Sequence, residues 1–252
     1  MTAEYFKDYF SDNSAGYRKY RPAYPDSFFE YLAIIAPSSA AAWDCATGSG
    51  QAARKLARHF SKVIATDASI RQISNAVPDE NVYYQVARAE NSPIHSSAVD
   101  LITIAQALHW LDAKPFFAEA KRVLKPKGIL AVWSYNLLSV TPQLDDIIER
   151  FYKQTVGPYW PPERRLVEEG YQNISFPFTR IVSPDFSMTA EWSLEELLGY
   201  IATWSAVKVY RDETGNNPLD ALKKELGAHW GEPCRRYQVS WPLSVFIGKN
   251  DG

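Results

Sequence analysis

Two acidic residues and two glycines are spaced so that together they could hold a nucleotide. Asp44, Gly48 and Gly50 lie in the stretch WDCATGSG, and Asp67 closes the later stretch VIATD. Glycines allow positive φ angles and a close approach of the backbone to a ligand. A carboxylate at the spacing of Asp67 can accept hydrogen bonds from a ribose diol. The pattern indicates a nucleoside site; a ligand-free turn and an Asp that caps the next helix are the structural alternatives.

The acid within the glycine stretch limits which nucleotide fits. Gly48, Gly50 and Ala53 satisfy the dinucleotide pattern G-x-G-x-x-G/A, which is a weak match when taken alone. The carboxylate of Asp44 would repel a pyrophosphate but would attract an amino group or a sulfonium. A later apolar run ends in ARAEN, where a turn of backbone amides could meet an adenine edge. A positively charged adenine nucleoside is favoured, and a nicotinamide-dependent oxidoreductase remains the second interpretation.

Short apolar runs alternate with amphipathic segments from residue 40 to residue 135. Strands are expected at AAAWDCAT, KVIATD, VYYQVAR, VDLITIAQAL and GILAVWSY, and helices at QAARKLARHF, SIRQISNAV and AKPFFAEAKRVL. This alternation predicts an α/β fold, a doubly wound seven-stranded and mostly parallel sheet with helices on both faces. The stretch WPLSVFIGK is expected to supply the last strand, in antiparallel orientation. Ligands of such sheets bind beyond the carboxyl ends of the strands, where Asp44 and Asp67 fall.

The remaining segments are assigned to the same domain, which spans residues 1–252. Residues 1–25 are rich in aromatics and end in YRKYRPAYP, where Pro22 and Pro25 stop any helix, so we expect an arm or lid there. The stretches SLEELLGYIATWSAVKVYR and PLDALKKELGAHW read as amphipathic helices. They predict a helical insertion on the substrate side at residues 189–236.

Composition argues against several classes of protein. Of the 252 residues, 46% are hydrophobic, as in a globular protein. A net charge of −2 gives no basic surplus for nucleic acid, and no apolar run reaches the ~20 residues of a membrane helix. Two cysteines and four histidines make neither a disulfide framework nor a metal site expected. We expect a cytoplasmic protein that acts on a small molecule; the sequence does not indicate its oligomeric state.

The same residues carry a resemblance to a known family. WDCATGSG, ATDAS, ARAENSPIHSSAVDLITIAQALHW and RVLKPKGILAVW resemble the class I S-adenosylmethionine-dependent methyltransferases of the type 11 branch. YRKYRPAYP and TWSAVKVYR are similar to a sub-branch that includes trans-aconitate and other small-acid methyltransferases. The resemblance covers most of the chain. It implies that the chain binds S-adenosyl-L-methionine and transfers the methyl group to a carboxylate or hydroxyl oxygen of a small molecule.

The resemblance also implies which residues hold the methyl donor. The glycine loop would line the methionine part, the end of the second strand would bind the ribose, and the third-strand turn would border the adenine. The residues so assigned are Asp44, Ala46, Gly48, Gly50, Asp67, Ala68, Ala89, Glu90 and, at the tip of the fourth strand near the sulfonium, Gln106.

Two positions depart from the family pattern. Ala46 stands where a glycine is common, and a methyl group is tolerated there if φ is negative. Arg88 stands where an acid commonly accepts the adenine amino group. Because Arg cannot accept a hydrogen bond, Glu90 or a backbone carbonyl would have to replace that contact.

Methyl transfer from a sulfonium is an in-line displacement that needs alignment and exclusion of water. A carboxylate acceptor needs no base, whereas a hydroxyl acceptor is helped by one. His109 in QALHWLD is the candidate catalytic base, with a structural role in its loop as the alternative. The candidates for substrate binding are Tyr17, Tyr20, Arg21, Trp110, Trp133, Trp204 and Arg211.

Each of these candidates also has a structural alternative. Arg21 and Arg211 could grip a carboxylate of donor or acceptor, although an Arg near a helix end is often simply solvated. The tryptophans could wall an apolar pocket or fill the core. A protein that binds the donor without turnover is the alternative to an enzyme.

Overall fold

The computed structural model describes residue 20, residues 22–232 and residues 234–251. Tyr17 and Arg21 lie outside the described residues, as does most of the expected arm. The chain divides into two compact units. The sheet unit contains residues 23–136, 163–188 and 242–251, and the helical unit contains residues 20, 22, 137–162 and 189–241. The expected insertion at 189–236 belongs to the helical unit, which also takes in residues 137–162.

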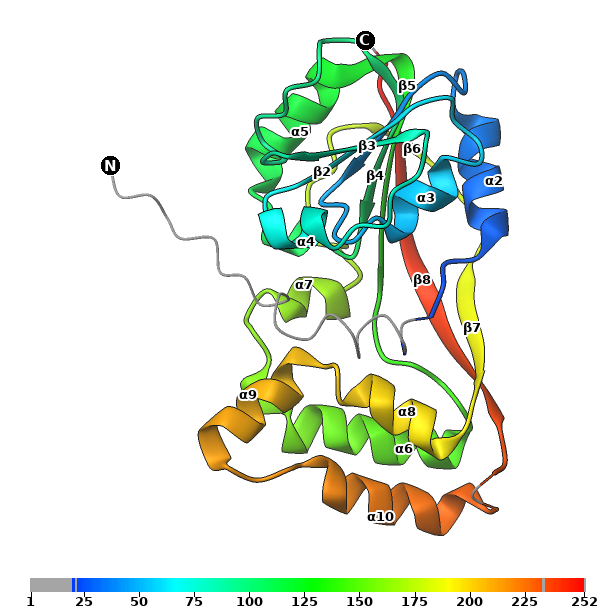
Figure 1. Cartoon of the computed structure of the whole chain (residues 1–252), viewed down its shortest axis with the longest axis vertical. Helices are drawn as coiled ribbons and strands as arrows, with labels where there is room; N and C mark the ends of the chain where they lie inside the picture. The colour runs from blue at the N-terminus through cyan, green and yellow to red at the C-terminus, as the bar shows by residue number, and fades with distance from the viewer. Residues whose placement is uncertain (1–19, 21, 233, 252) are drawn as a thin grey trace. The chain divides into compact units, whose positions relative to one another are not determined.

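The sheet unit is built on a mixed sheet (Figure 1). The strand order is β3-β2-β1-β4-β5-β8-β6, in which β1 to β5 are parallel and β8 runs antiparallel to β5 and β6. The strands are β1 (Ala42–Cys45), β2 (Val63–Asp67), β3 (Val82–Val86), β4 (Val99–Ala105), β5 (Leu124–Tyr135), β6 (Thr179–Ile181) and β8 (Tyr237–Lys249). A further strand, β7 (Ser187–Trp192), pairs with β8 beside this path. The predicted doubly wound, mostly parallel sheet with an antiparallel last strand is confirmed, but in the described residues it has eight strands in place of the predicted seven, since β7 also pairs with β8.

Helices cover both faces of this sheet (Figure 1). Those of the sheet unit are α2 (Asp26–Ile35), α3 (Gln51–Leu56), α4 (Ile70–Ser74), η1 (Leu108–Trp110), α5 (Ala113–Val123) and α7 (Arg164–Glu168). On one face, Trp43 of β1 packs against Phe116 of α5. On the other face, Trp133 of β5 packs against Phe28 and Phe29 of α2. Because successive strand residues point to opposite faces, the apolar runs of the sequence supply both layers of the core.

The stretch LKPKG, residues 124–128, forms an irregular start of β5. Val99 pairs with Leu124 and Leu101 with Ile129, so the register shifts between these two pairs. The Lys125 ammonium lies 2.9 Å from the Asp100 carboxylate beside this irregularity. The pair fastens β5 to the amino end of β4.

The helical unit has its own aromatic core. Its helices are α6 (Pro142–Arg150), η2 (Phe151–Thr155), η3 (Gly157–Tyr159), α8 (Leu194–Ile201), α9 (Ser205–Thr214) and α10 (Leu219–Trp230). Helix α10 packs against α6 and α8. η2 is a single turn of π-helix that carries Phe151 and Tyr152 against Trp204. Residues distant in sequence therefore build one folded unit around these rings.

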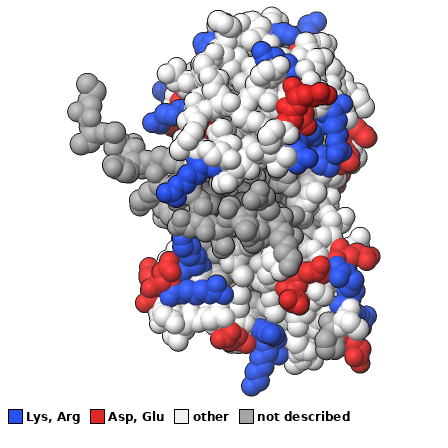
Figure 2. Space-filling model, in the orientation of Figure 1, with Lys and Arg blue, Asp and Glu red and all other residues white. Residues whose placement is uncertain are grey.

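Two surface properties bear on the expected partners. No helix in the described ranges combines the length and the apolarity needed to cross a membrane. On the face drawn in Figure 2, positive and negative side chains of the described residues are interspersed and do not gather into a basic patch.

Candidate active site

One carboxylate joins the ends of β1 and β2. Asp67, the last residue of β2, accepts the backbone N–H of Gly48 at 2.9 Å through Oδ2 and that of Ser69 at 2.8 Å through Oδ1. Asp67 therefore holds the loop after β1 through its carboxylate, at the carboxyl edge of the sheet where ligands of such folds bind.

The loop after β1 has an alternating left-handed backbone. The φ angles are 55° at Ala46, 58° at Gly48 and 85° at Gly50. A Cβ built on Gly48 would have the Gln72 Oε1, at 3.9 Å, as its nearest neighbour among the described residues. The space above Gly48 is thus open with respect to those residues, as a ligand cradle requires.

Ala46 corrects one expectation. Its methyl group was expected to be tolerated through a negative φ, but φ is +55°. In that region the Cβ of an L-residue crowds the backbone, at a cost of ~1–2 kcal/mol. The sequence could not reveal this strain, because the alternating loop geometry follows from tertiary contacts such as the one between Gly48 and Asp67.

Gly50 is constrained by a tyrosine that sequence reasoning missed. A Cβ at Gly50 would lie 2.1 Å from the hydroxyl oxygen of Tyr84. The Tyr84 hydroxyl donates to the carbonyl of Val77 at 3.1 Å, which fixes the ring under the loop. Burial, followed by the negative charge of Asp44, raises the pKa of Tyr84 to about 12. The signal was present in the alternation of VYYQV, since Ala65 pairs with both Asp44 and Tyr84 and all three share one face.

Asp44 is buried beneath the loop. Its carboxylate accepts the hydroxyl groups of Thr47 at 2.5 Å and Thr103 at 2.7 Å. Burial raises the pKa of Asp44 to about 6, although both hydroxyl groups act in the opposite direction. The residue therefore brings negative charge to the underside of the loop and is itself only 1% exposed.

The residues expected at the adenine edge lie beyond β2 and β3. Ala68 directly follows Asp67 and is exposed, whereas Ala89 is buried. The carboxylate of Glu90 accepts the backbone N–H of Asp112 at 3.2 Å. The side chain of Arg88 is 73% exposed and lies 3.4 Å from Glu90. Arg88 is thus directed largely to solvent, and Glu90 is the acid at this edge.

Gln106 stands directly after β4, as expected, but its side-chain amide is engaged by β5. Nε2 donates to the carbonyl of Tyr135 at 2.9 Å, and Oε1 accepts the Tyr135 N–H at 2.9 Å. The φ angle of Gln106 is 54°. The side-chain amide thus makes the two hydrogen bonds that the backbone of a neighbouring strand would make with Tyr135. These contacts hold the tip of β4 in a strained conformation.

His109 is bound to a tyrosine from a distant part of the sequence. Its Nδ1 lies 2.8 Å from the hydroxyl oxygen of Tyr171, and the two rings are stacked. Burial, and secondarily the charge of Arg164, lowers the pKa of His109 to about 3. The imidazole is therefore neutral and a weak base near pH 7, which agrees with a structural role in this loop.

Arg164 places a positive charge near the tip of β4. Its Nη2 donates to the side-chain oxygen of Asn136, the residue after β5, at 2.9 Å. After burial, this charge is the second cause that lowers the pKa of His109. Burial raises the pKa of the Tyr171 phenol, and the charge of Arg164 acts against that rise. Neither Arg164 nor Tyr171 was identified from sequence, because both lie in a segment without a recognisable motif.

The remaining substrate candidates fall in different environments. Trp110 contacts His109, with ring centroids 4.6 Å apart. Trp133 is fully buried beneath α2, so we leave it out of the proposed pocket. The helical unit contains Tyr20, Trp204 and Arg211. The ring of Tyr20 lies against Gly199, and the guanidinium of Arg211 donates to the side-chain oxygen of Asn217, which follows α9.

Comparison with known proteins identifies the family. The model of a family described as "Methyltransferase domain" matches residues 43–132. A Dictyostelium discoideum protein named as a methyltransferase is 34% identical over 98% of this chain and 96% of its own length. A solved structure from Anaeromyxobacter dehalogenans, described as a type II methyltransferase, is 39% identical with a TM-score of 0.87, and the match covers 91% of this chain and 98% of that one.

A methyltransferase structure from Anabaena variabilis, 16% identical with a TM-score of 0.54 over 85% of this chain and 96% of that one, shares the fold alone. The chain belongs to the class I S-adenosylmethionine-dependent methyltransferases. This membership gives no support to the nicotinamide-dependent interpretation.

Proposed function

We propose that this chain transfers a methyl group from S-adenosyl-L-methionine to a carboxylate oxygen of a small molecule. One observation carries the donor assignment: the Asp67 carboxylate accepts hydrogen bonds from the backbone N–H groups of both Gly48 and Ser69. This contact supports a ribose site at Asp67, next to a glycine loop that leaves room for the methionine part. When bound, the donor supplies an activated methyl group, and the protein aligns it and excludes water.

The side chains beside β4 support a carboxylate as the acceptor. His109 is neutral, poorly basic and bound to Tyr171, so it is badly suited to remove a proton from a hydroxyl group. A carboxylate is already ionised at neutral pH and needs no base. The charge of Arg164 would favour an acidic molecule at this place. These features also support membership of the small-acid branch.

Labelled donor tests the proposal. The purified protein is incubated with methyl-labelled S-adenosylmethionine and a panel of small carboxylic acids, phenols and alcohols. We expect label in a product that releases methanol in mild alkali, as esters do and ethers do not, and we expect the Asp67→Ala variant to lose this transfer. Alkali-stable label would contradict a carboxylate acceptor. Donor binding without transfer to any acceptor would support the non-catalytic alternative.

A further inference from the structure

The segment between β3 and β4 carries the proposed adenine edge but has little structure of its own. From Arg88 to Ser96 the one backbone–backbone hydrogen bond runs from the N–H of Asn91 to the carbonyl of Arg88, with an N···O distance of 3.4 Å. Regular anchoring resumes only at Ser97, whose N–H donates to the carbonyl of Arg122 at 2.9 Å. Ala89 and Glu90 form the tip of that turn. Such a long hydrogen bond is a weak restraint, so the position of the tip depends on other contacts.

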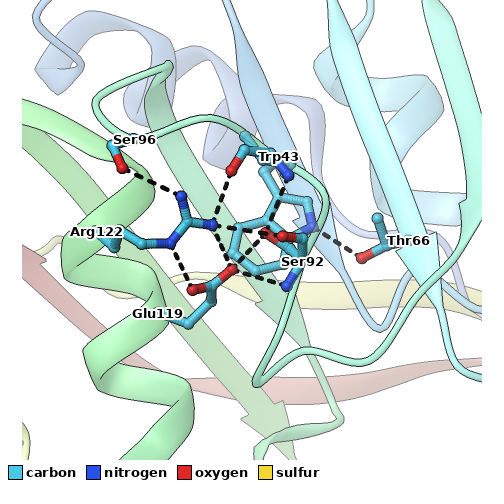
Figure 3. Close-up of polar contacts among 7 residues, drawn as sticks. Trp43, Thr66, Ser92, Ser96, Glu119 and Arg122 are labelled. Carbon is cyan, nitrogen blue, oxygen red and sulfur yellow. Dashed lines mark hydrogen bonds and ion pairs between the residues drawn. The ribbon is translucent and has the colours of Figure 1, made fainter.

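A buried glutamate on α5 supplies part of that restraint (Figure 3). Glu119 Oε1 accepts both the backbone N–H and the hydroxyl of Ser92, each at 2.7 Å. The side chain of Glu119 is only 8% exposed. Hydrogen bonds from Arg122, followed by those from Ser92, lower the pKa of Glu119, so the carboxylate is ionised when it receives Ser92.

Arg122 holds the same segment from the next turn of α5 (Figure 3). Its Nη2 donates to the carbonyl of Ile94 at 2.7 Å, and its Nη1 donates to the hydroxyl of Ser96 at 3.2 Å. The guanidinium also binds both oxygens of Glu119, at 2.7 and 2.8 Å. Charge-assisted, two-point contacts of this kind fix orientation as well as distance.

The tip is also tied to α5 on its other side. Glu90 accepts the N–H of Asp112, the residue that precedes α5, at 3.2 Å. The turn from Arg88 to Asn91 is therefore held by contacts on two sides, one with the residue before α5 and one, through Ser92, with the Glu119–Arg122 pair. A partly buried ion pair is poor evidence for stability alone, because desolvation opposes its attraction. This pair, however, binds the N–H of Ser92 and the carbonyl of Ile94 in the same segment. Such contacts are better explained by a role in holding that segment in place.

We propose that Glu119 and Arg122 are positioning residues that hold the Ala89–Glu90 edge against the adenine and so set the selectivity of the site for that base. The inference rests on the proposed function, since it takes the adenine to lie at this edge. Neither residue touches the donor; both act through Ser92 and the residues that follow it.

The test compares two ligands that differ only at the base. S-adenosylhomocysteine carries the 6-amino group, and S-inosylhomocysteine carries a carbonyl oxygen there. Binding of each is measured by calorimetry, and the ratio of the two dissociation constants is the readout. Wild type is expected to prefer the adenine ligand, and Glu119→Gln is expected to reduce that preference about fivefold, the equivalent of one neutral hydrogen bond.

Asp100→Asn is the matched control. The Asp100–Lys125 pair has a similar exposure, 2% and 34%, against 8% and 38% for Glu119 and Arg122, and it joins the other end of β4 to β5. Its loss should lower stability and leave the ratio unchanged. Ser92→Ala is the second variant; it keeps both charges and removes only the hydroxyl, so it decides the question if Glu119→Gln does not fold.

The outcomes separate this inference from the proposed function. Wild type that binds neither ligand would overturn both. Wild type that binds both equally would overturn the inference alone, as would an unchanged ratio in Glu119→Gln and Ser92→Ala. A reduction of the same size in Asp100→Asn would also overturn it, because the effect would then be one of general stability.

Discussion

The carboxylate of Asp67 accepts the N–H of Gly48 at 2.9 Å, so the last residue of one strand shapes the loop that follows its neighbour. Gly48 lies 19 positions earlier in the sequence, and the parallel pairing of β1 with β2 brings the two together. The proposed donor site thus depends on two strand ends and not on the glycine motif alone.

The strained alanine of the loop gives a prediction on stability. Ala46→Gly should raise the free energy of unfolding by about 1 kcal/mol, because glycine adopts φ near 55° without the Cβ clash. The gain is smaller than the full strain, since glycine also loses more backbone entropy on folding. Urea denaturation of the two proteins measures the difference. An unchanged or lower stability would show that the methyl group costs nothing at this position.

Gly50 should tolerate no side chain while Tyr84 is present. Gly50→Ala combines a φ of 85° with a contact of 2.1 Å to the tyrosine hydroxyl, so we expect a loss of about 2–4 kcal/mol in the free energy of unfolding. In a Tyr84→Ala background the steric part disappears, and the same substitution should cost only about 1 kcal/mol. Equal losses in the two backgrounds would show that Tyr84 does not restrict the loop.

His109 makes stability depend on pH below neutrality. Its pKa is lowered to about 3 by burial, whereas in the unfolded chain it is near 6.5, so the unfolded state gains a proton first. The resulting stability is fully present above pH 6.5 and falls as the pH decreases, by about 2 kcal/mol between pH 7.5 and 5. His109→Gln should lack this decrease. The free energy of unfolding of both proteins is measured by urea denaturation at several pH values in this range. The same change with pH in both proteins would contradict a neutral, buried imidazole.

Asp44 should act in the opposite direction. Burial raises its pKa from 3.8 to about 6, so the folded state holds a proton that the unfolded state has already lost. Its contribution to stability is present below pH 3.8 and is lost as the pH rises through 6. Relative to Asp44→Asn, wild type should lose about 2 kcal/mol between pH 4.5 and 7 and little more above that. A difference that does not vary with pH would mean that the carboxyl is not buried in the folded protein.

Much of the sheet could be predicted from sequence because its signals are local. The stretch AKPFFAEAKRVL was expected to be a helix, and all but its last residue form α5. The apolar runs that become β1, β2 and β4 follow from the same kind of pattern. Asp44 and Asp67 could be placed at one sheet edge, since parallel strands with intervening helices align their carboxyl ends.

Contacts that join distant segments could not be predicted. The partner of His109 is Tyr171, 62 positions away in a segment without periodicity, and the side chain of Gln106 faces Tyr135 of another strand. Glu119 and Arg122 did carry a local signal, because residues three apart share a helix face. Their buried partner Ser92 becomes evident only in the folded chain.

Calorimetric titration with S-adenosylhomocysteine tests the central claim most directly. The matched control is Asp79→Ala, because Asp79, like Asp67, accepts the amide two residues further along, at 3.2 Å, but lies in the turn before β3. We expect one ligand to bind per wild-type or Asp79→Ala chain and Asp67→Ala to bind at least about tenfold more weakly, since hydrogen bonds to a charged group are lost. No binding to wild type at millimolar ligand, or equal binding to Asp67→Ala, would contradict the account.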